Sequence, residues 1–156
     1  KAPQASVELK EDWGIEGDAH AGKWHRQVSL LGFEAIEDFK DRGADVSDGA
    51  FGENLIVEGF DLKHLPLGTR FTTSGGVELE LTQIGKECHT HCAIYYSMGE
   101  CIMPHEGVFV RVIKGGTVHP GDTIEITRNP TPEQTAEVAA YAAACVAAQK
   151  GAPFVA

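Results

Sequence analysis

The sequence predicts a mainly β domain, built as a barrel or a sandwich. Three observations lead to this prediction. Short apolar or alternating runs recur through most of the chain, 18 glycines are scattered among them, and only two segments show helical features. Many short strands joined by glycine-rich turns are typical of all-β barrels and sandwiches. A length of 156 residues fits a single domain.

Five segments are predicted as strands. Residues 77–82 alternate apolar and polar side chains strictly, which is the pattern of a strand with one buried and one solvated face. The other four segments are short apolar runs or are rich in β-branched and aromatic side chains. They cover residues 28–31, 54–57, 108–113 and 123–127.

A short helix is predicted after the first of these strands. Phe33, Ile36 and Phe39 lie three residues apart and therefore share one face of a helix. Gly43 follows as a residue that favours the end of a helix. The three side chains are expected to form the apolar face of this helix.

A longer helix is predicted near the carboxyl-terminal end. Thr131 suits the N-cap, Pro132 suits the first helical position, and Gln134 completes a capping box. An alanine-rich run follows and ends at Gly151. We therefore divide the chain into a β domain, residues 1–128, and a helical extension, residues 129–156, that packs on the barrel or on a second copy. The predicted apolar stripe of the helix is Val138, Tyr141, Ala142, Cys145 and Val146.

Charge and hydropathy argue against several classes of function. The net charge is −10 and the pI is near 5.1, whereas binding to nucleic acid needs clustered Lys and Arg. The same charge argues against an anionic membrane surface, and no apolar run approaches the roughly 20 residues of a membrane span. Four cysteines are too few for a disulfide scaffold, so we expect a cytoplasmic location. The chain opens with KAPQ, and we expect its native start to lie upstream.

Thiol chemistry is concentrated in residues 82–105, TQIGKECHTHCAIYYSMGECIMPH. This stretch holds three of the four cysteines and three of the seven histidines. Lys86 precedes Cys88 by two residues, and His89 and His91 follow it. Nearby cations stabilise a thiolate, which is the reactive form of cysteine. Cys88 is therefore predicted to be a nucleophile or a ligand, against the alternative of a buried, inert cysteine.

The same stretch leaves a zinc site open as an alternative. Cys88 and Cys92 are separated by three residues, and so are Cys101 and His105. Structural zinc sites use two ligand pairs of this kind. The gap between the pairs is short, however, and it contains the apolar Ile94. Packing, or resolution of a persulfide, is an equally open role for Cys92 and Cys101.

Two further segments carry polar side chains suited to binding. The sequence GIEGDAHAGKWHR, residues 14–26, does not have the order of a P-loop or a dinucleotide fingerprint. Its cations and histidines suit an anion such as a phosphate, and the alternative is a turn capped by Asp18. In GAFGENL, residues 49–55, Asn54 could read the edge of a heterocycle and Glu53 could orient a His or an Arg, or the pair could cap a turn. The candidates in the first segment are His20, Lys23, His25 and Arg26.

Together these segments resemble the MOSC domain, the family named for the carboxyl-terminal domain of molybdenum-cofactor sulfurase. The matching stretches occur in order: GIEGDAHAG, WHRQVSLL, FGENLIVEG, LPLGTRF, TQIGKECH and EGVFVRVIKGGTVHPGDTIEI. They span residues 14–126, and the sequence looks most similar to the small stand-alone bacterial members. The resemblance implies a compact MOSC-type β-barrel with a few short helices and, in this chain, the added alanine-rich helix.

The resemblance also implies a site. The family is associated with the molybdenum cofactor and with sulfur carriage through an invariant cysteine, and Cys88 in GKECH stands at that position. Cys88 would then accept sulfur as a persulfide or ligate molybdenum. Pyridoxal phosphate would belong to a partner cysteine desulfurase and not to this chain. The implied contacts for phosphate and pterin groups are Lys23, Arg26, Arg70, Lys86 and Arg111.

The expected function is that of a sulfur carrier or cofactor-binding protein in the maturation of the molybdenum or tungsten cofactor. Its expected partners are a cysteine desulfurase, other cofactor-biosynthesis proteins and the enzymes that receive the cofactor. The carboxyl-terminal helix is a candidate surface for self-association. The sequence leaves open whether the chain catalyses sulfur transfer or a cofactor-dependent reaction. A zinc-stabilised, non-catalytic interaction domain is the alternative.

Overall fold

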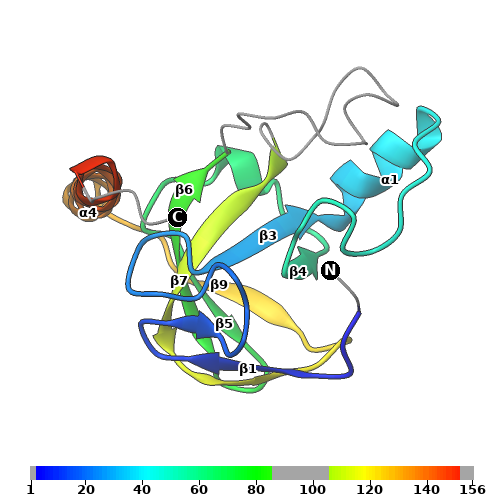
Figure 1. Ribbon diagram of the computed structural model, residues 1–156, viewed down its shortest axis with the longest axis horizontal. Helices are drawn as coiled ribbons and strands as arrows, with labels where there is room; N and C mark the ends of the chain where they lie inside the picture. Colours follow the sequence, from blue (N-terminus) through cyan, green and yellow to red (C-terminus); the bar gives the residue numbers. More distant parts are fainter. Residues whose placement is uncertain (1–2, 86–105, 152–156) are drawn as a thin grey trace.

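The computed structural model describes residues 3–85 and 106–151, and the chain folds as a mainly β protein. Its larger sheet has six strands and curls into a half-barrel (Figure 1). All neighbouring strands are antiparallel except β3 and β4, which are parallel. The order across the sheet is β4 (Leu55–Val57), β3 (Val28–Gly32), β7 (Val108–Lys114), β6 (Glu78–Ile84), β5 (Arg70–Thr73) and β9 (Ile124–Arg128).

A smaller antiparallel sheet contains β2 (Gly14–Ile15), β1 (Val7–Lys10) and β8 (Gly116–Val118). Two glycines allow parts of the chain to approach closely around it. A Cβ added at Gly115 would lie 2.5 Å from the Leu9 carbonyl oxygen, and one at Gly14 would lie 2.8 Å from the Gln27 carbonyl oxygen. Gly14 also has a φ of 122°, a conformation that side chains rarely adopt.

The larger sheet carries a buried cluster on each face. Alternate residues of a strand point to opposite faces, so Leu30 and Val110 join the main core, whereas Leu31 and Phe109 face the other way. Helix α1 (Phe33–Asp41) covers this second face through Ile36 and Phe39. The prediction of this helix is confirmed, but Phe33 is 42% exposed and does not belong to its buried face. A short 3-10 helix, η1 (Leu62–His64), was not predicted.

The five predicted strands are confirmed to within about two residues at each end, while β1, β2, β5 and β8 were missed. The half-buried pattern predicted for residues 77–82 is wrong on its polar face. Glu80 and Thr82 are 1% and 0% exposed, as buried as their apolar neighbours. Chain segments far away in the sequence cover both side chains, which a local alternation pattern does not reveal.

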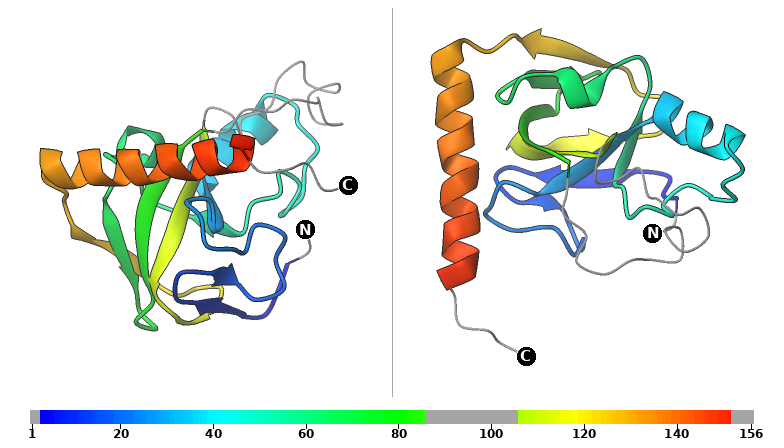
Figure 2. Two further views of the ribbon diagram at one scale, coloured as in Figure 1. Left: turned by 60° about the vertical axis from the view of Figure 1, so that its left-hand side comes forward. Right: turned by 90° about the horizontal axis from the view of Figure 1, so that it is seen from above.

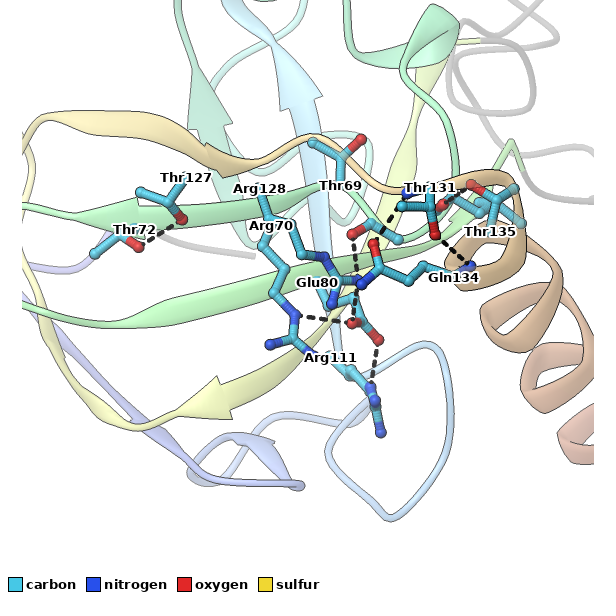
Figure 3. Close-up of polar contacts among 12 residues, drawn as sticks. Thr69, Arg70, Thr72, Glu80, Arg111, Thr127, Arg128, Thr131, Gln134 and Thr135 are labelled. Atoms are coloured by element: carbon cyan, nitrogen blue, oxygen red, sulfur yellow. Dashed lines mark hydrogen bonds and ion pairs between the residues drawn. The ribbon is translucent and has the colours of Figure 1, made fainter.

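Helix α4 (Pro132–Gly151) begins as the sequence predicts. The Gln134 amide donates to Thr131 Oγ1 at 3.2 Å, and the Thr131 amide donates to Gln134 Oε1 at 2.9 Å, which makes a complete capping box (Figure 3). Val138 is buried and Val146 is 38% exposed, so the predicted apolar stripe is wrong at Val146. Within the described residues, no helix is long and apolar enough to cross a membrane.

Helix α4 lies along one side of the six-stranded sheet (Figure 2) and is joined to it beside the buried carboxylate of Glu80. Arg70 and Arg111 donate through Nε to Glu80 at 3.0 and 2.9 Å, and Arg128 donates through Nη2 at 3.1 Å (Figure 3). The Arg111 guanidinium also lies 5.0 Å from the ring centroid of Tyr141 in α4. Three cations from three strands therefore converge on one buried anion, under the helix.

Candidate functional site

A hydrogen-bond network ties the loop at residues 16–27 to the turn at residues 47–54. The Asn54 side chain is its centre: Nδ2 donates to Asp18 Oδ1 at 3.0 Å, and Oδ1 accepts from the Ser29 amide at 2.8 Å and from Ser29 Oγ at 3.0 Å. Asp18 Oδ2 in turn accepts from the His20 amide at 2.9 Å. The two sequence motifs GDAH and FGEN are therefore parts of one structure, joined through Asp18 and Asn54.

The aromatic side chains of this loop hold Arg26 in place. The Arg26 guanidinium lies 4.7 Å from the ring centroid of Trp24 and 5.5 Å from that of Phe109 on β7. Trp24 is itself anchored, because its Nε1 donates to the His20 carbonyl at 2.7 Å. Arg26 forms no ion pair with a carboxylate of the described residues, and its Nε is buried without a hydrogen bond there. A guanidinium that stacks on two rings and meets no carboxylate in residues 3–85 or 106–151 is suited to bind an anion.

His25 points in the other direction, toward β6. Its ring is 1% exposed, and its Nε2 lies 2.8 Å from Gln83 Oε1. Burial lowers the pKa of His25, the positive charge of Arg26 lowers it further, and the hydrogen bond to Gln83 offsets part of this effect. Because this pKa lies below the ordinary histidine value of 6.5, the neutral form of the ring predominates at pH 7. Thr82 Oγ1 donates to the His25 carbonyl and fastens the backbone of the loop to β6.

This loop meets the sheet where β6 ends and β7 begins. Gln83 Nε2 donates to the Gly85 carbonyl at 2.8 Å, and the Gly85 amide donates to the Gly107 carbonyl at 2.7 Å. Gly85 is the third residue before Cys88 in the sequence. The following predicted site residues lie outside the described part of the chain: Lys86, Cys88, His89, His91, Cys92, Cys101 and His105.

The other predicted residues fall into two groups. His20, His25, Arg26 and Asn54 come together in the loop and turn just described, with Lys23 exposed on the same loop. Arg70 and Arg111 instead bind Glu80 beside α4. The polar atoms of the Asn54 amide are engaged by Asp18 and Ser29, which lie 36 and 25 positions away in the sequence.

Sequence reasoning missed Gln83 and Trp24, and it offered Glu53 only as a residue that could orient a His or an Arg. Gln83 is five residues before Cys88, but its partner His25 is 58 residues away, so no local spacing pointed to it. Trp24 stands between the candidate residues Lys23 and His25, and that position was the one signal available. Among the described residues, no group of three or more His, Cys, Asp or Glu could hold a metal ion.

Glu53 is a second buried carboxylate, beside Asn54. It is 4% exposed, and neither carboxylate oxygen makes a hydrogen bond of normal geometry within the described residues. Burial raises its pKa, whereas the nearby amides of Gly49, Phe51 and Glu53 itself act in the opposite direction with a smaller effect. Glu53 also lines a cavity of about 620 Å³ between β4 and the β8–β9 turn.

The pKa of Glu53 predicts a pH-dependent stability. A raised pKa means that Glu53 stays protonated to a higher pH in the folded protein than in the unfolded chain. The free energy of unfolding therefore decreases as the pH rises above 4.5. We expect the wild-type protein to become less stable relative to Glu53→Gln between about pH 4.5 and 7, measured by urea unfolding at both pH values. The exposed Glu58→Gln is the control, and an unchanged difference between the two pH values would contradict the expectation.

The loop and turn that form this network lie within the part of the chain that matches a known family model. Residues 17–125 match the model of the MOSC domain. The chain belongs to the MOSC domain family. Its MOSC match includes the Asp18–Asn54 network, the Arg26 loop and the segment that carries Cys88. No functionally curated protein matches the sequence significantly.

Solved structures share the MOSC fold of this chain. YiiM from Geobacillus stearothermophilus is 19% identical with a TM-score of 0.63, over 100% of this chain and 82% of that one. YiiM from Escherichia coli is 19% identical with a TM-score of 0.60, over 98% and 74%. The YUAD protein from Bacillus subtilis is 20% identical with a TM-score of 0.59, over 78% and 84%. At these identities the likeness concerns the fold alone.

Proposed function

We propose that this MOSC domain carries sulfur for the maturation of the molybdenum or tungsten cofactor, with Cys88 as the acceptor. The observation that supports the proposal is the state of Arg26. Its guanidinium is held by Trp24 and Phe109 and has no carboxylate partner among the described residues. In a protein with a net charge of −10, a stacked cation with no carboxylate partner in the described part of the chain is suited to bind an anion.

The site is joined to the cysteine-bearing segment through the chain itself. The loop of Arg26 is fastened to β6 by the His25–Gln83 hydrogen bond, and β6 leads to Gly85, three residues before Cys88. An anionic donor or cofactor phosphate bound by Arg26, with the exposed Lys23 on the same loop, would be held near the start of that segment. Bound molybdenum cofactor would supply a metal with sulfur ligands, and these two cations are the residues suited to its phosphate.

Sulfur transfer to Cys88 requires only thiol exchange. The Cys88 thiolate attacks the outer sulfur of a persulfide on the donor enzyme, and the S–S bond of the donor breaks. Cys88 becomes the persulfide, and the donor cysteine leaves as a thiolate. The proton of the Cys88 thiol is given up before the attack, so no external oxidant or reductant is needed.

Sulfur loading tests this function directly. Purified protein incubated with a cysteine desulfurase, pyridoxal phosphate and cysteine is expected to gain about 32 Da, which corresponds to one sulfur atom, on the peptide that contains Cys88. Cys88→Ser should abolish the gain, whereas the matched variant Cys145→Ser, on α4, should keep it. Loading of Cys88→Ser to the wild-type extent would refute the role of Cys88. Metal analysis of the same sample separates the zinc-stabilised alternative, which requires stoichiometric zinc and loss of folding with a chelator.

A further inference from the structure

We propose that Gln83 is a positioning residue that fixes the tautomer of His25, so that Nε2 carries the hydrogen and Nδ1 stays a proton acceptor in the site. This inference rests on the proposed function, since it assigns a role within the same site. The evidence is a hydrogen-bond chain of three described groups: the Gly85 carbonyl, the Gln83 amide and the His25 ring.

The orientation of the Gln83 amide follows from its two partners. The Gly85 carbonyl oxygen can only accept, so the atom 2.8 Å from it must be the NH2 group of Gln83. The other end of the amide, Oε1, can only accept and lies 2.8 Å from His25 Nε2. Nε2 must therefore be protonated for this hydrogen bond to form. A reversed amide would place two acceptors together at Gly85, which costs a hydrogen bond.

The opposite ring nitrogen is left as a buried acceptor. In a neutral imidazole with hydrogen on Nε2, Nδ1 carries only a lone pair. His25 Nδ1 is buried and has no hydrogen-bond partner among the described residues. Leaving a buried polar atom without a partner destabilises a fold, so its presence calls for a functional explanation. A base held ready for a proton donor is such an explanation.

The surroundings keep this base uncharged. Arg26 is the charged group that acts on His25 in the described structure, and its positive charge opposes protonation of the ring. Trp24 meets the ring edge-on at a centroid distance of 5.7 Å, and β6 contributes the neutral Gln83 and Thr82. A carboxylate in place of Gln83 would favour the imidazolium and remove the acceptor. A neutral amide holds the ring without charging it.

The role proposed for this pair in sulfur loading concerns proton movement. A thiol must lose its proton before it attacks a persulfide, and a neutral imidazole with a free nitrogen can take up that proton. Gln83 touches no reacting atom and acts through His25. Changes at Gln83 are therefore expected to slow sulfur loading about tenfold while leaving its final extent unchanged.

Nitrogen-15 spectra of histidine-labelled protein report the tautomer without any activity assay. In the wild type, long-range proton–nitrogen correlations of His25 should show a protonated Nε2 and an unprotonated Nδ1, and this pattern should persist below pH 6.5. Gln83→Glu should convert His25 to the doubly protonated ring near pH 7, and Gln83→Met should give mixed tautomers. The exposed His64 and His119 serve as internal references. Thermal melts confirm that both variants fold.

The outcomes separate this inference from the proposed function. If the wild-type ring carries its hydrogen on Nδ1, or if Gln83→Glu leaves the spectrum unchanged, Gln83 does not set the tautomer and the inference fails. If the spectra agree but both variants load sulfur at the wild-type rate, the positioning role fails as well. If the wild type accepts no sulfur at all, the proposed function fails while the spectra still decide the tautomer.

Discussion

Replacing Glu80 with alanine is expected to lower the free energy of unfolding by about 3 kcal/mol, because it leaves three guanidinium groups around an empty, buried position. The Glu80 side chain is 2% exposed and accepts from Arg70, Arg111 and Arg128 at 2.9 to 3.1 Å. These arginines are each about a quarter to a third exposed, which places the expected cost at the lower end for a buried pair. Urea unfolding measures the effect.

The same change should loosen α4. Arg111 lies against Tyr141 of that helix. Arg128, which precedes the helix in the chain, also donates to the Gly68 carbonyl at 2.8 Å. Without Glu80, the mutual repulsion of the arginines opposes both contacts. We therefore expect faster tryptic cleavage after Arg128 in Glu80→Ala than in the wild type under native conditions.

Glu78→Ala is the matched control for both measurements. Glu78 lies two residues earlier on β6 and on the same face, but it is only partly buried and forms no ion pair within the described structure. Its replacement should change the free energy of unfolding by less than about 1 kcal/mol. An effect of Glu80→Ala no larger than that of Glu78→Ala would show that the arginine cluster does not stabilise the fold.

Asn54→Ala is expected to cost about 3 kcal/mol of stability and most of the sulfur-loading rate. The change removes hydrogen bonds to Asp18 and to the amide and hydroxyl groups of Ser29, and it leaves the partly buried Asp18 carboxylate with one contact fewer. Each buried group that loses its partner costs about 1–3 kcal/mol. Because Asp18 also holds the His20 amide, the loop that carries His25 and Arg26 should lose its attachment to the turn at residues 47–54.

Asn54→Asp distinguishes the effect of the lost hydrogen bonds from the effect of a smaller side chain. It keeps the shape of asparagine but places a second carboxylate where the amide now lies 3.0 Å from Asp18 Oδ1, so it should destabilise at pH 7 and recover partly in acid. Asn129, the other asparagine of the chain, is exposed, and Asn129→Ala should be neutral. Unfolding curves and loading rates of the three variants, side by side, decide the point. A stable Asn54→Ala variant with wild-type loading would mean that the network is dispensable.

Much of the fold could be predicted from local sequence signals. The capping box at Thr131 and Gln134 marked the start of α4, because its two hydrogen bonds depend on residues only three positions apart. The runs that became β3, β7 and β9 were recognised because β-branched and apolar side chains suit a pleated, buried surface. β5 was missed because it is only four residues long, although Phe71 and its two threonines suit a strand.

The candidate site likewise contains residues that local sequence signals identified and partners that they did not. Its motif residues His20, His25, Arg26 and Asn54 were singled out by side-chain chemistry and by order along the chain. Their partners were not. Gln83 and Phe109 reach the loop from strands 58 and 83 positions away, and Arg70 and Arg111, predicted as anion contacts, bind the buried Glu80. Contacts between residues so far apart in the sequence depend on how the sheet curls and on which of its side chains stay exposed.

By itself the sequence determined the family, the main strands and helices α1 and α4, and it supplied the candidate reactive residues, since these follow from local spacing and from the chemistry of single side chains. Only the tertiary structure decided which polar groups are buried and which groups they bind. Glu80 and Thr82 look like a solvated strand face, yet arginines from three strands cover one and the His25 loop covers the other. The physical reason is that burial of a polar group is tolerated only with partners, and those partners come from distant parts of the chain.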